Sequence, residues 1–135
     1  MKILVIDNTG QISACLAEVE ADLNCRTDEI QALNALEQLQ PELVFLSYAF
    51  RGEQTHDYIR LLVKTLPSAS LIIVGEQMAQ ECVLRCLLCG AKGFQELQDL
   101  QYYSFRLVQA ISRGEAWVSR RMVASLLDAI RQLTL

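Results

Sequence analysis

Side chains that could bind a ligand or take part in a reaction follow two apolar runs of the sequence, at the points where these runs end. Asp7 and Asn8 come directly after the run at 3–6, and Ser47 follows the run at 43–46. In a parallel α/β sheet, ligands bind and reactions occur beside the carboxyl ends of the strands. One carboxylate, one amide and one hydroxyl make a poor Mg²⁺ site, because this ion prefers octahedral oxygen coordination that includes carboxylates and phosphate.

Ser47 could also act as a nucleophile, which would require a base to activate its hydroxyl. The only histidine is His56, which belongs to the next predicted loop or helix. We therefore favour a simpler role for Ser47, in which the hydroxyl bonds to the backbone at the end of its strand.

Three of the five cysteines lie close together in the sequence, at Cys82, Cys86 and Cys89. On the helix predicted for residues 78–89, this spacing places them on one face. Two interpretations are open: thiols packed against the sheet as small apolar groups, and a thiol or metal sensor. An odd number of cysteines without an export signal favours reduced thiols over disulfides.

Short apolar runs alternate with amphipathic segments along the whole chain. The runs indicate buried strands, whereas apolar residues spaced by three or four indicate helices. This alternation predicts an α/β fold, a doubly wound parallel sheet with helices on both faces and right-handed crossovers. The predicted strands are residues 3–6, 25–27, 43–46, 71–74 and 93–95, and the predicted helices are residues 12–23, 32–39, 55–66, 78–89, 102–113 and 120–135.

Composition and charge limit the possible surroundings of the protein. Of its 135 residues, 52% are apolar, which suits a globular domain with a core. Residues 1–112 carry 8 basic and 14 acidic side chains, so this part should not bind nucleic acid unaided. No apolar run approaches the ~18 residues of a membrane span, and the N-terminus is typical of a strand, not of a signal peptide. We therefore expect a cytoplasmic protein without membrane contact.

Four stretches resemble response-regulator receiver domains, the CheY-like modules of two-component signalling, in particular those of LuxR/NarL-type transcription regulators. They are ILVIDN (3–8), PELVFLS (41–47), SLIIVGE (70–76) and GAKGF (90–94). The resemblance implies a flavodoxin-like sheet with strand order 2-1-3-4-5. Residues 1–113 would form the receiver-like domain. Residues 111–130 resemble the connecting segment of such regulators, and residues 114–135 would form a linker helix toward a DNA-binding domain that is absent from this chain.

The resemblance also assigns roles to single positions, and most of them carry an unexpected residue. Ser47 stands where a receiver domain has its phosphoryl-accepting aspartate, and Asn8 replaces the second of two acids, of which Asp7 remains. Gly75 and Leu97 replace the hydroxyl residue and the lysine that contact the phosphoryl group. These replacements predict a phosphorylation-independent domain that is no enzyme, with no catalytic residue, no cofactor and weak or absent Mg²⁺ binding.

Phe94 stands where receiver domains carry an aromatic residue that moves on phosphorylation. Gly75 lacks the hydroxyl that would couple to this ring. We therefore expect Phe94 to be fixed, in the core or half-buried.

A partner-binding face is predicted on the helices at 78–89 and 102–113 and on the strand between them. Within the second helix, Phe105, Val108 and Ile111 are expected to face inward. The apolar residues expected outside the core are Leu84, Leu88, Tyr102, Tyr103 and Leu107. Two DNA-binding domains on a paired site require a two-fold dimer, so we expect a homodimer.

Three other functions compete with a regulatory receiver module. One is the sensor that would use Cys82, Cys86 and Cys89. Another is a stand-alone adaptor that binds a protein partner and has no DNA-binding domain. The third is a small-ligand pocket at the carboxyl ends of the strands, where Asn8, Ser47 and Gly75 leave space.

Overall fold

Five parallel strands form one sheet in the order β2-β1-β3-β4-β5, which confirms the predicted fold class and strand order. The computed structural model describes residues 1–134. The strands are β1 (Lys2–Ile6), β2 (Asp22–Arg26), β3 (Leu43–Ser47), β4 (Ser70–Gly75) and β5 (Gly93–Glu96). The helices are α1 (Gln11–Cys15), α2 (Glu29–Leu39), α3 (Thr55–Thr65), α4 (Gln80–Leu88), α5 (Leu97–Ser112) and α6 (Arg120–Thr134), with 3₁₀ turns η1 (Tyr48–Phe50) and η2 (Gly52–Gln54) before α3.

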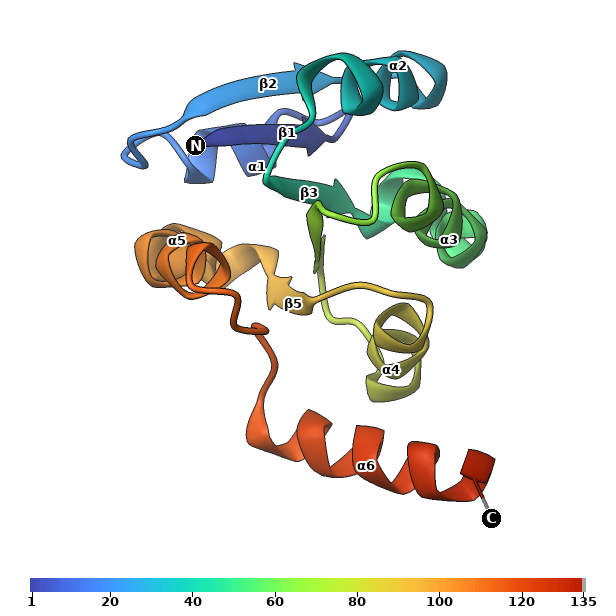
Figure 1. Ribbon diagram of the computed structural model, residues 1–135. Helices are drawn as coiled ribbons and strands as arrows, with labels where there is room; N and C mark the ends of the chain where they lie inside the picture. Colours follow the sequence, from blue (N-terminus) through green and yellow to red (C-terminus); the bar gives the residue numbers. More distant parts are fainter. Residues whose placement is uncertain (135) are drawn as a thin grey trace.

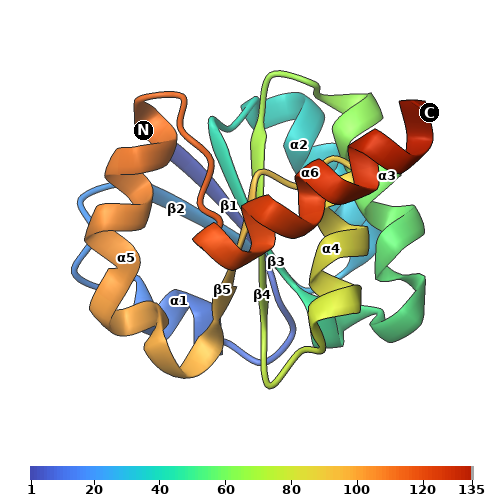
Figure 2. The same cartoon turned by 90° about the horizontal axis from the view of Figure 1, so that it is seen from below.

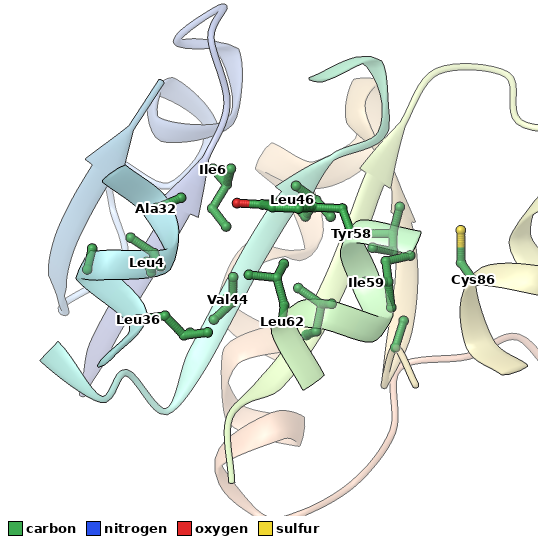
Figure 3. Close-up of a cluster of buried hydrophobic side chains, with 14 residues drawn as sticks. Leu4, Ile6, Ala32, Leu36, Val44, Leu46, Tyr58, Ile59, Leu62 and Cys86 are labelled. Atoms are coloured by element: carbon green, nitrogen blue, oxygen red, sulfur yellow. The ribbon is translucent and has the colours of Figure 1, made fainter. Parts of the chain in front are cut away.

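Helices cover both faces of the sheet, with α1 and α5 on one face and α2, α3 and α4 on the other (Figure 1). The central strands are therefore buried on both sides, which explains their nearly continuous apolar sequence. In Figure 3, Tyr58, Ile59 and Leu62 of α3 pack beside Val44 and Leu46 of β3. Within residues 1–134, no helix has the length and apolar character needed to cross a membrane.

Polar side chains organise the starts of α2 and α3 in different ways. Asp28 caps α2, because its Oδ1 accepts hydrogen bonds from the backbone N–H groups of Ile30 and Gln31, both at 3.0 Å. Thr55 does not cap α3. It is the first residue of that helix, and its hydroxyl donates to the carbonyl oxygen of Tyr48 at 3.1 Å.

Two helices differ from the sequence-based prediction. The helix predicted over residues 12–23 ends at Cys15, because Leu23 is needed for β2, where it pairs with Ile3. The helix predicted from residue 102 already begins at Leu97. Its inward stripe therefore differs from the prediction, and Phe105 is 65% exposed. The buried residues of α5 are Leu100, Ser104, Leu107 and Ile111.

The segment after α5, residues 115–134, follows the β5 edge of the sheet, and we call it the C-terminal arm. The N–H of Trp117 donates to the carbonyl oxygen of Lys92 at 3.0 Å, and the N–H of Phe94 donates to the carbonyl oxygen of Trp117 at 3.1 Å. α6 then lies across α4, with Met122 buried (Figure 2). The arm thus covers an edge strand that would otherwise present unpaired backbone groups.

Candidate functional site

Asp7, the one acid of the predicted site, is only 4% exposed, and the loop after β1 engages both of its carboxylate oxygens. Oδ1 accepts hydrogen bonds from the Thr9 N–H at 3.0 Å and the Thr9 hydroxyl at 2.8 Å. Oδ2 accepts from the N–H of Ile12, inside α1, at 3.1 Å. Gly10, which precedes α1, offers no side-chain cap. The carboxylate of Asp7 therefore stabilises the start of α1 in place of an N-cap side chain.

The donor set around Asp7 does not fit Mg²⁺, the metal that the resemblance implies. Its carboxylate already serves the backbone of the neighbouring loop. Asn8 is exposed, and Ser47 can offer only a hydroxyl. Mg²⁺ needs near-ideal octahedral oxygen coordination and is usually bound through one or two carboxylates together with phosphate oxygens. Among the residues that the structure describes, no group of three His, Cys, Asp or Glu side chains is placed to hold a metal ion.

A cavity of about 200 Å³ lies at the carboxyl ends of β3 and β4. Ser47, Gly75 and Leu97 line it together, whereas Asn8 does not. The side chain of Ser47 makes no capping hydrogen bond to the 3₁₀ turn that follows it, so the bond that we expected for its hydroxyl is not formed there. His56 is buried in α3 and does not line this cavity, so it is not placed to activate Ser47.

Met78 fills the space that a side chain at position 75 would need. An ideal Cβ at Gly75 would overlap Sδ of Met78 and lie 2.8 Å from its Cγ. Met78 was not singled out from the sequence, because the only signal for it is the missing side chain at Gly75, whose place it fills. Glu76 is the only charged residue that lines the cavity. A phosphoryl group would therefore meet a thioether, the side chain of Leu97 and a carboxylate, all of them unfavourable neighbours for an anion.

The loop after β4 is held by a contact that the sequence did not indicate. Oε2 of Glu96, at the end of β5, accepts a hydrogen bond from the backbone N–H of Gln77 at 3.0 Å. Gln77 has a φ of 49°, a left-handed conformation that costs about 1–2 kcal/mol for a residue with a side chain. Leu97, the first residue of α5, is half-buried and packs against the core on that face of the sheet. The protein's own groups thus fix this loop.

The loop after β3 is tied to α2. Arg51 forms an ion pair with Glu29, and its Nη2 donates to Oε1 of Gln54 at 2.9 Å. Its guanidinium carbon lies 5.4 Å from the ring centroid of Tyr58. Burial raises the pKa of Tyr58 to about 12, so its neutral hydroxyl donates to the carbonyl oxygen of Glu29 at 2.9 Å.

The cysteines at the fourth helix differ in burial. Cys86 is buried, whereas Cys82 and Cys89 are half-buried. Burial raises the pKa of Cys86 to about 12, which keeps it as an unreactive thiol at neutral pH. The Tyr48 hydroxyl donates to Sγ of Cys82 at 3.9 Å, and burial raises the pKa of Tyr48 to about 12. Packing accounts for Cys86, while thiol sensing through the other two cysteines stays a prediction.

Comparison with known proteins relates this geometry to solved structures. No protein-family model and no curated protein matches the chain. The isolated receiver domain of RcsB from Salmonella enterica serovar Typhimurium, in the apo form, is similar with a TM-score of 0.81 and 16% identity, over 95% of this chain and 98% of that chain. This chain has the receiver-domain fold.

Two further structures share the receiver fold. A LuxR-family two-component response regulator from Aurantimonas sp. SI85-9A1 has a TM-score of 0.76 and 15% identity, over 95% of this chain and 96% of that chain. The RcsB response regulator from Salmonella typhimurium, in a structure concerned with its DNA interaction, has a TM-score of 0.79 and 16% identity, over 93% of this chain and 68% of that chain. The resemblance stated from the sequence is thus confirmed at the level of the fold.

Three of the positions singled out from the sequence lie together at the carboxyl ends of the strands. Ser47 ends β3, Gly75 ends β4 and Leu97 follows β5, and all three reach the same cavity. Phe94 is half-buried in β5, and its N–H bonds to the C-terminal arm.

The prediction of a partner face on α4, β5 and α5 needs correction. Leu107 is 0% exposed and belongs to the core, because the inward stripe of α5 runs through it. Leu84 is half-buried, whereas Leu88 is 47% exposed and Tyr102 is 78% exposed. Tyr103 lies beside the tryptophan of the C-terminal arm, with 6.3 Å between their ring centroids. The arm thus occupies part of this face.

Proposed function

We propose that this chain is a phosphorylation-independent receiver domain, which acts as a binding module and not as an enzyme. The receiver fold of regulators such as RcsB supports a role in regulation. The resemblance of residues 111–130 to a connecting segment supports a place before a DNA-binding domain, in a LuxR-type two-component transcription regulator. Such a protein would work in the cytoplasm, contact DNA only through that further domain and need no cofactor.

The observation that supports this proposal most directly is the packing of the Met78 side chain against Gly75. Phosphoryl transfer depends on positioning and on neutralising the charge of the transferred group. Met78 fills the space above Gly75, and Leu97 supplies no cation. Asp7 is committed to the loop after β1. The groups that remain neither hold Mg²⁺ nor balance the charge of a phosphoryl group.

We expect no phosphorylation when the purified protein is incubated with Mg²⁺ and acetyl phosphate, and the intact mass should stay unchanged. A phosphorylatable receiver domain in the same mixture serves as the positive control. Ser47→Asp should not restore switching, because Gly75 and Leu97 still lack the coupling groups, so phosphodonor should change neither its tryptophan emission nor its sedimentation. Stoichiometric addition of one phosphoryl group to the wild-type protein would disprove the proposal.

We further propose that the chain forms a homodimer that needs neither Mg²⁺ nor phosphodonor. Within residues 120–134, α6 exposes four large apolar side chains at helical spacing, namely Val123, Leu127, Ile130 and Leu133. Such a stripe is suited to contact with a second copy. Two DNA-binding domains on a paired site also require a two-fold dimer.

Sedimentation should show a dimer at micromolar protein concentration. Leu127→Glu should weaken the dimer at least ~10-fold, because it places a charge in an apolar contact. Gln132→Glu, at an exposed position on the opposite side of α6, serves as the control and should have little effect. Leu88→Glu tests α4 separately. A monomer throughout the concentration range would refute the dimer and would favour the stand-alone adaptor.

A further inference from the structure

A second cavity lies between α5 and the C-terminal arm, with β5 between them. Its volume is about 490 Å³, within the range of about 300–1,000 Å³ that small-molecule sites have. It shares no lining residue with the cavity at Ser47 and Gly75. Whatever it binds is therefore separate from the degenerate phosphorylation site.

Three aromatic residues line this second cavity: Phe94 from β5, Tyr103 from α5 and Trp117 from the arm. Phe94 and Trp117 are half-buried, and Tyr103 is 39% exposed. The rings of Tyr103 and Trp117 lie 6.3 Å apart at an angle of 55°. The rings of Tyr103 and Trp117 thus leave aromatic surface open toward this cavity, whereas Phe94 packs against the core on the other face of the sheet. A ligand with apolar substituents can use such a surface.

Trp117 is held in place before any ligand arrives. Its Nε1 donates to Oε1 of Gln95 at 2.9 Å, and Nε2 of Gln95 donates to the carbonyl oxygen of Glu96 at 3.1 Å. The backbone N–H and carbonyl oxygen of Trp117 are both hydrogen-bonded, to Lys92 and to Phe94 of β5 respectively. Binding would therefore require little ordering of this ring, which lowers the entropic cost.

The charges at this cavity are of one sign. Glu96 and Glu115 are its charged lining residues, and no lysine or arginine lines it. Arg106 lies outside the lining but places its guanidinium carbon 6.0 Å from the ring centroid of Tyr103. Two carboxylates would repel an anion. A neutral apolar molecule would remove water from these carboxylates without offering a hydrogen bond or a charge in its place.

We propose that this cavity binds a small organic cation, an alkylammonium or guanidinium ion with apolar substituents. The faces of Tyr103 and Trp117 would contact the cation and its substituents. Glu115 would balance its charge, because the carboxylate of Glu96 already accepts a hydrogen bond from the N–H of Gln77. This inference goes beyond the proposed function, because it gives the domain an input that needs no phosphoryl group. Since the arm forms one wall of the cavity, the cation binds only the docked arm and stabilises it in that position.

Trp117 is the only tryptophan of the chain, so its emission reports on the cavity directly. Titration with choline, and separately with ethylguanidinium, should give a saturable change in emission with a Kd in the millimolar range or below. The neutral analogue 3,3-dimethylbutan-1-ol has the shape of choline without its charge. It should bind at least ~5-fold more weakly, because the attraction of the cation to the rings is lost.

Matched variants locate the binding. Tyr103→Ala and Glu115→Gln should each weaken choline binding at least ~5-fold. Tyr102→Ala and Glu81→Gln, at exposed positions that do not line the cavity, should leave it unchanged. Circular dichroism checks that each variant is folded. The proposal is overturned if neither cation saturates the signal by about 50 mM, if the alcohol binds as tightly as choline, or if the control variants weaken binding equally.

Discussion

Replacing Asp7 with alanine should lower the free energy of unfolding by about 3 kcal/mol, which corresponds to a drop in Tm of roughly 10 °C. The carboxylate of Asp7 is buried and accepts hydrogen bonds from the N–H groups of Thr9 and Ile12. Without it, these donors lose their partner at the start of α1, where Gly10 provides no substitute. Urea titration followed by circular dichroism measures the loss.

The neighbouring variants separate a structural role from a metal-binding role. Asn8→Ala changes an exposed side chain and should stay within about 0.5 kcal/mol of the wild type. Asp7→Asn keeps one acceptor and should lie between the wild type and Asp7→Ala. Mg²⁺ at about 10 mM should not raise the Tm of the wild type, since a ligand that binds the folded state would stabilise it. Our interpretation would be contradicted if Mg²⁺ raised the Tm of the wild type and this increase were absent in Asp7→Ala.

The fold followed from the sequence wherever burial alone decides the structure. The runs around Val5, Phe45 and Ile73 are buried on both faces of the sheet, so they are apolar without interruption and mark central strands. The failures lie at the periphery. The edge strand β2 is only partly buried, and Leu23 continued a helical spacing by chance, so the predicted helix ran into the start of β2 and the strand was predicted only at residues 25–27. Leu107 was misplaced because the start of α5 was set too late.

The site was harder to predict, because its decisive contacts join residues that are distant in sequence or of unremarkable type. Ser47, Gly75 and Leu97 could be singled out by what they lack. The contacts that replace the missing chemistry could not, since a methionine after β4 and a glutamate at the end of β5 are common choices. Met78 over Gly75 and Glu96 on the backbone of Gln77 depend on loop conformations that no local pattern specifies.

Replacing Gly93 with alanine should release the C-terminal arm from β5. An ideal Cβ at Gly93 would overlap the carbonyl oxygen of Trp117 and lie 2.9 Å from its carbonyl carbon, and backbone atoms cannot give way cheaply. Release would break the two backbone hydrogen bonds of Trp117 and expose Met122. We estimate the loss in arm docking at about 3 kcal/mol, from roughly 1 kcal/mol per hydrogen bond and the burial of one side chain.

The released arm should be visible in two independent measurements. The emission of Trp117 should shift to the red, and trypsin should cleave at Arg120 or Arg121 at least ~10-fold faster, because an undocked helix of this length is marginal in water. Gly75→Ala is the matched control: the same change meets the flexible side chain of Met78 and not a backbone, so it should leave the arm docked. If Gly93→Ala changed neither emission nor cleavage, then α6 would hold the arm on α4 without the help of β5. If it unfolded residues 1–113 as well, the arm would be an integral part of the receiver fold and could not serve as a separable linker.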